Sequence, residues 1–228
     1  MTTNNANLGQ PHLATYDGQF GPFTITESDR RGVVLYRAAL AIAALCFAIA
    51  SGLTLLPSVA SSPVLWSITA LYGGFWVALG VALAFIHIYL RPLHLALQLF
   101  WGIGGLASVA IALYIPQPLA LSAYQRPLTV LGIGFTFAAL TGIFFKEAFC
   151  FNRFETKLLT PIVPLLLLGH LSGLFPAGLE VGLLELWAIL FLIFAARKAV
   201  QPIPPDIGDK SVFAYLEQQR QQQSSISS

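Results

Sequence analysis

Long runs of apolar residues dominate the chain, and polar, charged or proline positions separate one run from the next. A helix rises 1.5 Å per residue, so about 20 apolar residues cross a bilayer core about 30 Å thick. Runs of about that length cover residues 33–56, 64–90, 93–115, 128–145, 158–175 and 179–196. The pattern predicts an all-α fold, a polytopic membrane helical bundle with about six transmembrane helices.

Three regions follow from this pattern. Residues 1–32 form a polar N-terminal tail, and residues 33–198 form the six-helix transmembrane domain. Residues 199–228 read as a Pro-rich linker, a short amphipathic helix and a disordered Gln/Ser tail. Thr26 and Asp29 stand three apart, like the residues of a capping box, and predict the start of the first helix.

The composition supports a membrane protein and excludes other classes. Hydrophobic residues make up 56% of the chain, charged residues 10%, and the mean hydropathy is +0.74, outside the range of soluble domains. A net charge of +2 is too small for a nucleic-acid surface, so we expect no nucleic-acid partner. Cys46 and Cys150 follow no CxxC spacing and are expected to be free thiols. The first 30 residues lack the apolar core of a cleavable signal peptide.

The chain contains no HExxH, no GxGxxG after a strand and no P-loop. We therefore expect no catalytic activity, no cofactor and no metal site.

The positive residues predict the orientation. All twelve Lys and Arg residues except Arg126 fall in the tails, loops and span ends of one side. Because cytoplasmic loops are enriched in Lys and Arg, we expect both termini in the cytoplasm.

Small residues recur every four positions in the first four spans, and such stripes allow helix backbones to approach closely. The stripes are Ala44, Ala48 and Gly52; Gly74, Ala78 and Ala82; Gly104, Ser108 and Ala112; Gly134, Ala138 and Gly142. The fifth and sixth spans lack them. This difference predicts a four-helix core with an appended hairpin.

The predicted loop at 146–157, KEAFCFNRFETK, alternates aromatic and charged residues. One interpretation is a membrane-surface anchor, with rings at the depth of the lipid headgroups and cations near anionic lipid. The other is a docking surface for another membrane protein, since Phe and Arg are common at interfaces. The candidate docking residues are Lys146, Glu147, Phe149, Phe151, Arg153, Phe154 and Lys157. We expect Glu147 and Glu155 to be solvated.

His170 and Glu185 are ionisable residues inside predicted spans, where such residues are rare and often functional. Counted from the turn at Ala177 and Gly178, both lie roughly 10 Å below the surface at 1.5 Å per residue. We predict that they form an intramembrane polar pair. A hydrogen-bonded pair would stabilise the bundle, whereas a pair beside a wet cavity would relay protons or bind a cation.

His87 and His94 flank the turn at Arg91 and Pro92. Paired histidines on facing helices would suit a haem or chlorophyll. The alternative is two interfacial histidines that form hydrogen bonds with loop carbonyls.

The segment Gly142 to Gly173, GIFFKEAFCFNRFETKLLTPIVPLLLLGHLSG, carries a resemblance. Together with the six spans, the polar N-terminal tail and the length, it resembles an uncharacterised integral membrane protein family of cyanobacteria and plastid-bearing lineages. The resemblance implies a photosynthetic membrane, either thylakoid or plasma membrane, and implies no activity. It adds weight to six positions: Lys146, Glu147, Phe149, Cys150, Phe151 and His170.

Two functional hypotheses follow. The leading one is a non-enzymatic assembly or stabilising factor for a larger, photosynthetic membrane complex, which docks through the loop at 146–157 and the last two spans. The alternative is a small proton- or ion-coupled transporter that uses His170 and Glu185.

Overall fold

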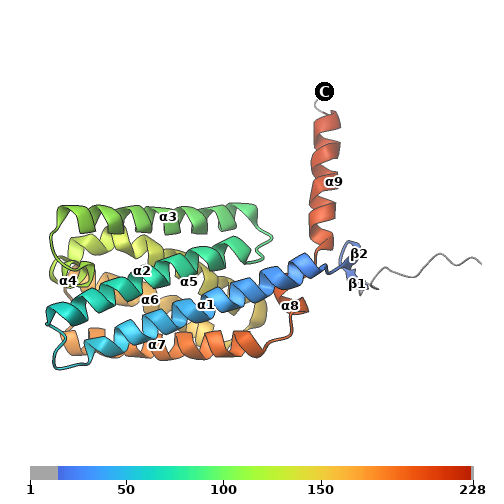
Figure 1. Ribbon diagram of the computed structural model, residues 1–228. Coiled ribbons are helices and arrows are strands. Elements are labelled where there is room, and N and C mark those ends of the chain that lie inside the picture. The colour runs from blue at the N-terminus through green and yellow to red at the C-terminus, as the bar shows by residue number, and fades with distance from the viewer. Residues whose placement is uncertain (1–14, 227–228) are drawn as a thin grey trace, which may run out of the picture. The chain divides into compact units, whose positions relative to one another are not determined.

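The computed structural model describes residues 15–226 and contains the six predicted spans as long, apolar helices (Figure 1). They are α1 (Glu27–Thr54), α2 (Ser62–Phe85), α3 (Arg91–Tyr114), α5 (Val130–Phe151), α6 (Phe154–Ser172) and α7 (Ala177–Val200). A 3-10 turn, η1 (Pro127–Thr129), extends α5 at its start. The shorter elements are β1 (Thr15–Gly18), β2 (Gly21–Thr24), α4 (Leu119–Gln125), α8 (Pro204–Ile207) and α9 (Ser211–Ile226). The predicted all-α membrane fold is confirmed.

The chain divides into two compact units. Residues 34–201 form the transmembrane unit, and the described parts of 1–33 and 202–228 form the terminal unit. The terminal unit thus combines segments from both ends of the chain.

Aromatic side chains fill the centre of the transmembrane unit. The ring of Phe47 lies 4.3 Å from that of Trp187, centroid to centroid, and Phe137 lies 5.2 Å from Trp187. Phe144 packs edge-on against Phe191 at 5.2 Å. Such contacts stabilise a bundle whose helices have little hydrophobic driving force to associate in lipid.

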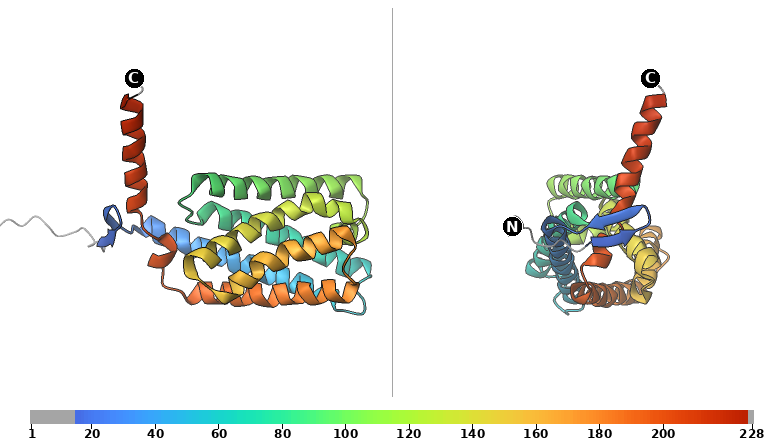
Figure 2. Two further views of the ribbon diagram at one scale, coloured as in Figure 1. Left: turned by 180° about the vertical axis from the view of Figure 1, so that it is seen from behind. Right: turned by 90° about the vertical axis from the view of Figure 1, so that its right-hand side faces the viewer.

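The predicted four-helix core with an appended hairpin is wrong. Trp187, Phe191 and Phe194 of α7 are among the largest fully buried side chains, so the last two spans belong to the core. By contrast, α3 contributes only Leu97 to the buried apolar cluster and runs along the edge of the bundle in both views of Figure 2. The prediction was based on stripes of small residues, and it therefore missed that the large rings of α7 fill the core.

One predicted stripe lies at a close helix contact. A Cβ at Gly104 of α3 would overlap the backbone of Thr136 on α5, so the two helices touch where this glycine stands. Gly52 of α1 faces open space instead. A small-residue stripe is therefore an interface in α3 and not around Gly52.

Two tryptophans clasp α2 to α3 in a reciprocal manner, an arrangement we call the tryptophan clasp. The indole N–H of Trp76 donates to the carbonyl of Trp101 at 3.1 Å, and the N–H of Trp101 donates to the carbonyl of Trp76 at 2.8 Å. The rings stack 4.4 Å apart. Each ring also covers a glycine four residues beyond the other tryptophan, Gly105 under Trp76 and Gly80 under Trp101, where a Cβ would collide with the indole.

The α5–α6 connection is shorter than the sequence predicted, and the α2–α3 connection is longer. Only Asn152 and Arg153 separate α5 from α6, so most of the predicted loop at 146–157 is helical. Asn152 adopts the left-handed conformation at φ 53°, and its N–H bonds to the carbonyl of Ala148, which ends α5. Helix α2 ends at Phe85, before the predicted end at residue 90.

The terminal unit contains a β-hairpin that the sequence did not predict. Its loop residues Gln19 and Phe20 donate their backbone N–H groups to Asp209 Oδ2 at 2.6 Å and to Ser211 Oγ at 3.0 Å. A Cβ at Gly18 would overlap the side chains of Asp209 and Ser211, so any larger residue here would force these two side chains to shift. The ring of Phe20 stacks on Tyr215 at 4.0 Å.

The start of α1 matches the prediction. The backbone N–H of Thr26 donates to Asp29 Oδ2 at 2.8 Å, and the N–H of Asp29 donates to Thr26 Oγ1 at 3.2 Å, the reciprocal bonds of a capping box. The predicted disorder of the Gln/Ser tail is wrong up to Ile226, because α9 continues through it. Glutamine is a good helix former, which accounts for the extension. Residues 1–14 of the predicted N-terminal tail, and Ser227 and Ser228, lie outside the described residues.

Candidate functional site

Charged side chains gather at one end of the transmembrane unit, which we call the basic end. It holds the α2–α3 and α5–α6 turns and the last turn of α7. Its cations are Arg37, Arg91, Lys146, Arg153, Lys157, Arg197 and Lys198. Within the transmembrane unit the opposite end holds Arg126.

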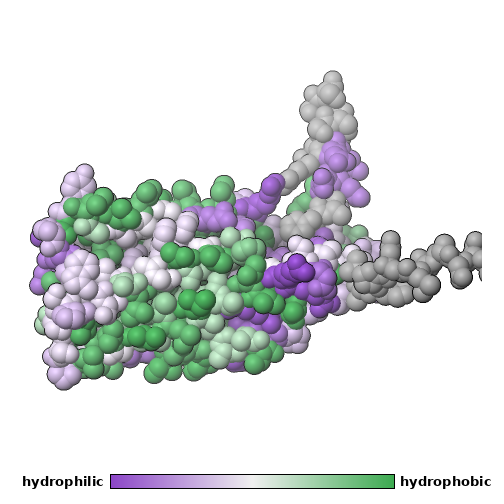
Figure 3. Space-filling model, viewed as in Figure 1, coloured by the Kyte–Doolittle hydropathy of each residue, from purple (hydrophilic) through white to green (hydrophobic). Residues whose placement is uncertain are grey.

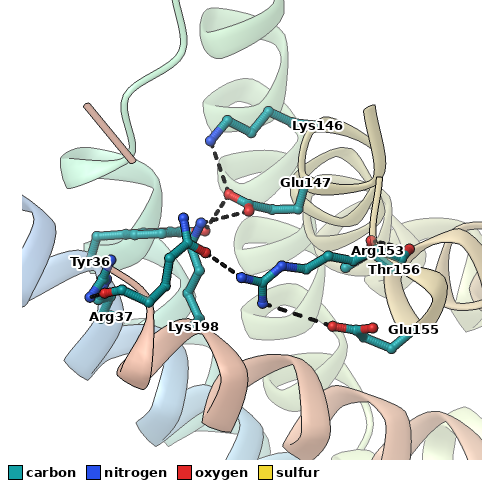
Figure 4. Close-up of polar contacts among 9 residues, drawn as sticks. Tyr36, Arg37, Lys146, Glu147, Arg153, Glu155, Thr156 and Lys198 are labelled. Atoms are coloured by element: carbon teal, nitrogen blue, oxygen red, sulfur yellow. Dashed lines mark hydrogen bonds and ion pairs between the residues drawn. The ribbon is translucent and has the colours of Figure 1, made fainter. Parts of the chain in front are cut away.

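A buried ion pair stands at the centre of the basic end (Figure 4). The ammonium of Lys198 on α7 lies 2.6 Å from Glu147 Oε2 on α5, and both side chains have no exposed surface. Lys146 lies 2.9 Å from the other carboxylate oxygen, to which the hydroxyl of Tyr36 on α1 donates at 3.3 Å. Breaking such a pair costs far more than breaking a surface pair, because it leaves an uncompensated charge in a medium of low dielectric constant.

Aromatic rings complete the surroundings of Lys198. Its ammonium lies 4.2 Å from the centroid of the Phe151 ring and 5.7 Å from that of Tyr36. Both distances are within the range of cation–π attraction. The positive charge is therefore stabilised by a carboxylate and by ring faces.

A second carboxylate extends this network to α6. Glu155 Oε2 lies 2.9 Å from Arg197 of α7, and Glu155 Oε1 lies 3.9 Å from Arg153. Arg153 also donates to the side-chain oxygen of Gln201 at 2.5 Å, and Arg37 of α1 donates to the backbone carbonyl of the same residue. The network therefore joins α1, α5, α6 and the end of α7.

The expectation that Glu147 and Glu155 are solvated is wrong, since their exposed fractions are 0% and 3%. The sequence did contain a signal. Leu140, Ile143 and Phe144 are fully buried, and Glu147 follows them on the same helical face. The charges at 146–157 masked this periodicity and made the segment look like a loop.

The candidate docking residues divide into two groups. Lys146, Glu147, Phe151 and Arg153 take part in the buried network. The exposed group is Phe149, with 84% of its surface exposed, Phe154, with 70%, and Lys157. We call this exposed group the aromatic ledge.

The predicted pairing of His170 with Glu185 is wrong. His170 Nδ1 lies 3.1 Å from both carboxylate oxygens of Glu180, and its Nε2 lies 3.1 Å from the carbonyl of Ala123. Glu185 accepts a hydrogen bond of 2.8 Å from Ser51 on α1. At 100° per residue, Glu180 and Glu185 point about 140° apart on α7, so only one of them can face α6.

This geometry gives His170 and Glu185 separate structural roles. Both ring nitrogens of His170 face acceptors, and the contacts tie α6 to α4 and α7. The transport alternative depended on a joint His170–Glu185 site, and it loses that structural basis.

His94 caps the end of α2. Its Nε2 lies 2.6 Å from the carbonyl of Leu83, one of the last carbonyls of α2, which lack a helical donor. This bond resembles the interfacial alternative for His94, with a carbonyl at the end of a helix in place of a loop carbonyl. Within residues 15–226 no group of three or more His, Cys, Asp or Glu side chains is arranged to hold a metal ion.

Both cysteines are free, as predicted. Cys150 is exposed next to the aromatic ledge, and Cys46 lies within the bundle.

Comparison with known families adds to this geometry. The family model described as uncharacterized integral membrane protein (DUF2301) matches residues 81–215. The chain belongs to this family. The DUF2301 match runs from the last turn of α2 into α9, and it includes Glu147, Glu155, Lys198 and the aromatic ledge. No curated protein and no solved structure matches the chain.

Proposed function

We propose that this integral membrane protein is a non-catalytic assembly or stabilising factor for a larger membrane complex. It binds a subunit of that complex through the aromatic ledge. The observation that carries the proposal is the exposure of Phe149 and Phe154, at 84% and 70%, on either side of the two-residue turn at the basic end. Large exposed aromatic side chains next to a cation are typical of interfaces.

The buried network beneath the ledge supports this role. Glu147 fixes the last turn of α5 and Glu155 fixes the first turn of α6, and both carboxylates are bound to the end of α7. The ledge is therefore carried by a turn with little freedom to move. A preorganised surface loses less conformational entropy when it binds.

The nature of the complex is supported by the sequence. The resemblance of residues 142–173 to membrane proteins of cyanobacteria and plastid-bearing lineages favours a photosynthetic complex in a thylakoid or plasma membrane. The excess of cations at the basic end favours a cytoplasmic position for the ledge and for both termini.

The test begins with extraction of the tagged protein from its native membrane in mild detergent, followed by a native gel. We expect the wild-type protein to co-migrate with subunits of a larger complex. Substitution of both rings, F149A with F154A, should remove the co-migration and leave the amount of inserted protein and its melting temperature unchanged. These side chains make few internal contacts, so their loss should not unfold the bundle.

A matched control is Tyr114→Ala, which removes a ring exposed by 87% at the opposite end. This variant should keep all partners. If the double variant also keeps them, the ledge is not the docking surface. If the wild-type protein migrates alone or as a small homo-oligomer, the assembly role is wrong.

A further inference from the structure

A cavity of about 140 Å³ opens between α1 and α2, in the half of the bundle away from the basic end. Its floor consists of the buried residues Phe47, Ser51 and Phe75. Its rim consists of partly exposed residues of the two helices, among them Cys46 and Ile68. The cavity therefore lies within two membrane spans and opens at the flank of the bundle.

The hydroxyl groups in the walls of this cavity already form hydrogen bonds within the protein. The Ser51 hydroxyl donates to Glu185 at 2.8 Å, and the Thr54 hydroxyl donates to the carbonyl of Ser51 at 2.7 Å. The hydroxyl of Tyr72 lies 2.8 Å from that of Ser108 and 3.1 Å from that of Thr136. A ligand that brought a polar group into the cavity would find ring and aliphatic surfaces and the weakly polar thiol of Cys46.

Water is a poor occupant for the same reason. A buried water needs two to four hydrogen-bond partners, whereas apolar cavities of roughly 150 Å³ stay dry and take up benzene-sized molecules. If the cavity is empty, the atoms that line it have no dispersion contacts on the open side. The cavity thus favours a hydrocarbon segment of about six carbon atoms.

The position of the cavity identifies the source of that hydrocarbon. Hydrophobic side chains cover the flank of the transmembrane unit (Figure 3). That flank faces lipid in a bilayer, where acyl chains are present at very high concentration. We propose that the α1–α2 cavity binds part of the acyl chain of a phospholipid in the leaflet opposite the basic end. This inference does not depend on the proposed assembly role.

The test uses the full-length protein in nanodiscs of phosphatidylcholine that carries a photoactivatable diazirine in the middle of one acyl chain. After illumination, mass spectrometry maps the lipid adducts. We expect the yield per residue at Ala50, Ile68 and Leu71 to exceed that at Leu106 at least fivefold. Leu106 is exposed by 74% on α3 and reports ordinary contact with lipid.

Filling the cavity provides the second arm. Ala50→Trp should lower the yield at Ile68 and Leu71 to the level of Leu106. The matched control, Ala110→Trp on the exposed face of α3, should leave the cavity adducts unchanged. Should A50W not fold, Ile68→Trp narrows the same cavity from α2, with adducts then scored at Leu71.

Three outcomes would overturn the proposal. The first is an equal yield at cavity and α3 positions, which means that no chain is held. The second is enrichment that survives the filled cavity. The third is a cavity adduct formed preferentially by a lipid with its diazirine in the headgroup, which would indicate a polar occupant.

Discussion

The Glu147–Lys198 pair provides the sharpest test of how the basic end is held together. Both side chains are fully buried and their charged atoms lie 2.6 Å apart. Removing one partner from such a pair costs about 3 to 5 kcal/mol, because the other charge stays buried and loses its oppositely charged partner. We expect Glu147→Gln and Lys198→Met each to destabilise the protein by about 3 kcal/mol.

The magnitudes follow from the contacts that remain. In K198M the carboxylate still has Lys146 at 2.9 Å and the Tyr36 hydroxyl at 3.3 Å, so the loss should lie at the low end of the range. In E147Q the ammonium keeps the ring face of Phe151 at 4.2 Å. One kcal/mol shifts the melting temperature of a chain of this size by about 2 to 4 °C, so each variant should melt about 6 to 12 °C lower.

The double variant E147Q/K198M should lose much less than the sum of the single changes. Residues in direct contact show interaction energies of about 0.5 to 3 kcal/mol in such cycles. The assay is thermal unfolding in detergent, followed by tryptophan fluorescence. Glu217→Gln, on an exposed position of α9, serves as the control and should not change the melting temperature.

Two results would refute this reasoning. One is a single variant that melts within about 2 °C of wild type, which would mean that the two charges are not paired and buried in the folded protein. The other is strict additivity in the double variant, which would mean that the two residues do not interact.

Three further predictions concern other parts of the chain. Because His170 and Glu185 have separate partners, the H170L and E185Q losses of about 1 to 2 kcal/mol should add in thermal unfolding, and a strong coupling between them would contradict the structure. Gly104→Leu should lower the melting temperature, at a cost of about 1 to 3 kcal/mol, because the new side chain overlaps the α5 backbone. Gly52→Leu should not lower it, because Gly52 faces open space. Equal effects of the two substitutions would show that α3 and α5 are not in close contact at Gly104. Hydrogen bonds from the Ser211 hydroxyl and the Gln19 N–H hold the pKa of Asp209 below its usual value near 3.8, so the hairpin contact should persist at neutral pH and weaken as the pH falls below about 3.8. The protection factor of the Gln19 amide in hydrogen exchange measures this, and an unchanged protection factor across that pH range would refute it.

The sequence predicted the spans well because a run of about 20 apolar residues is a direct signature of bilayer thickness. It could not predict which charges are buried. At Glu147 the apolar periodicity of α5 continues through a charged residue, and its buried partner Lys198 is more than fifty positions away along the chain. The charged neighbours of Glu147 therefore led to the wrong prediction that it is solvated.

The partner of His170 shows a second limit. Counting from the turn placed His170 and Glu185 at equal depth, but His170 lies two residues before the end of α6 at Ser172, whereas Glu185 lies eight residues after the start of α7 at Ala177. The direction of a side chain around its helix matters as well. Glu180 lies in the first turn of α7, level with the end of α6, and points about 140° away from Glu185 around the helix, so Glu180 meets His170. The hairpin at Thr15–Thr24 was missed because its stabilising contacts come from Asp209 and Ser211, at the other end of the sequence.

The tryptophan clasp has a consequence for how the protein is made. Its two hydrogen bonds and two glycine contacts all lie between neighbouring spans, so they can form before the rest of the chain has been synthesised. Each indole N–H then donates to a carbonyl and is not left without an acceptor in the hydrocarbon, which lowers the free-energy cost of burying it in lipid. A slip of one residue between α2 and α3 would break both halves of the arrangement at once. We therefore expect these two spans to enter the bilayer as a preassembled pair with a fixed register. Helix α5, which follows them in the chain, would then pack against a surface that is already formed.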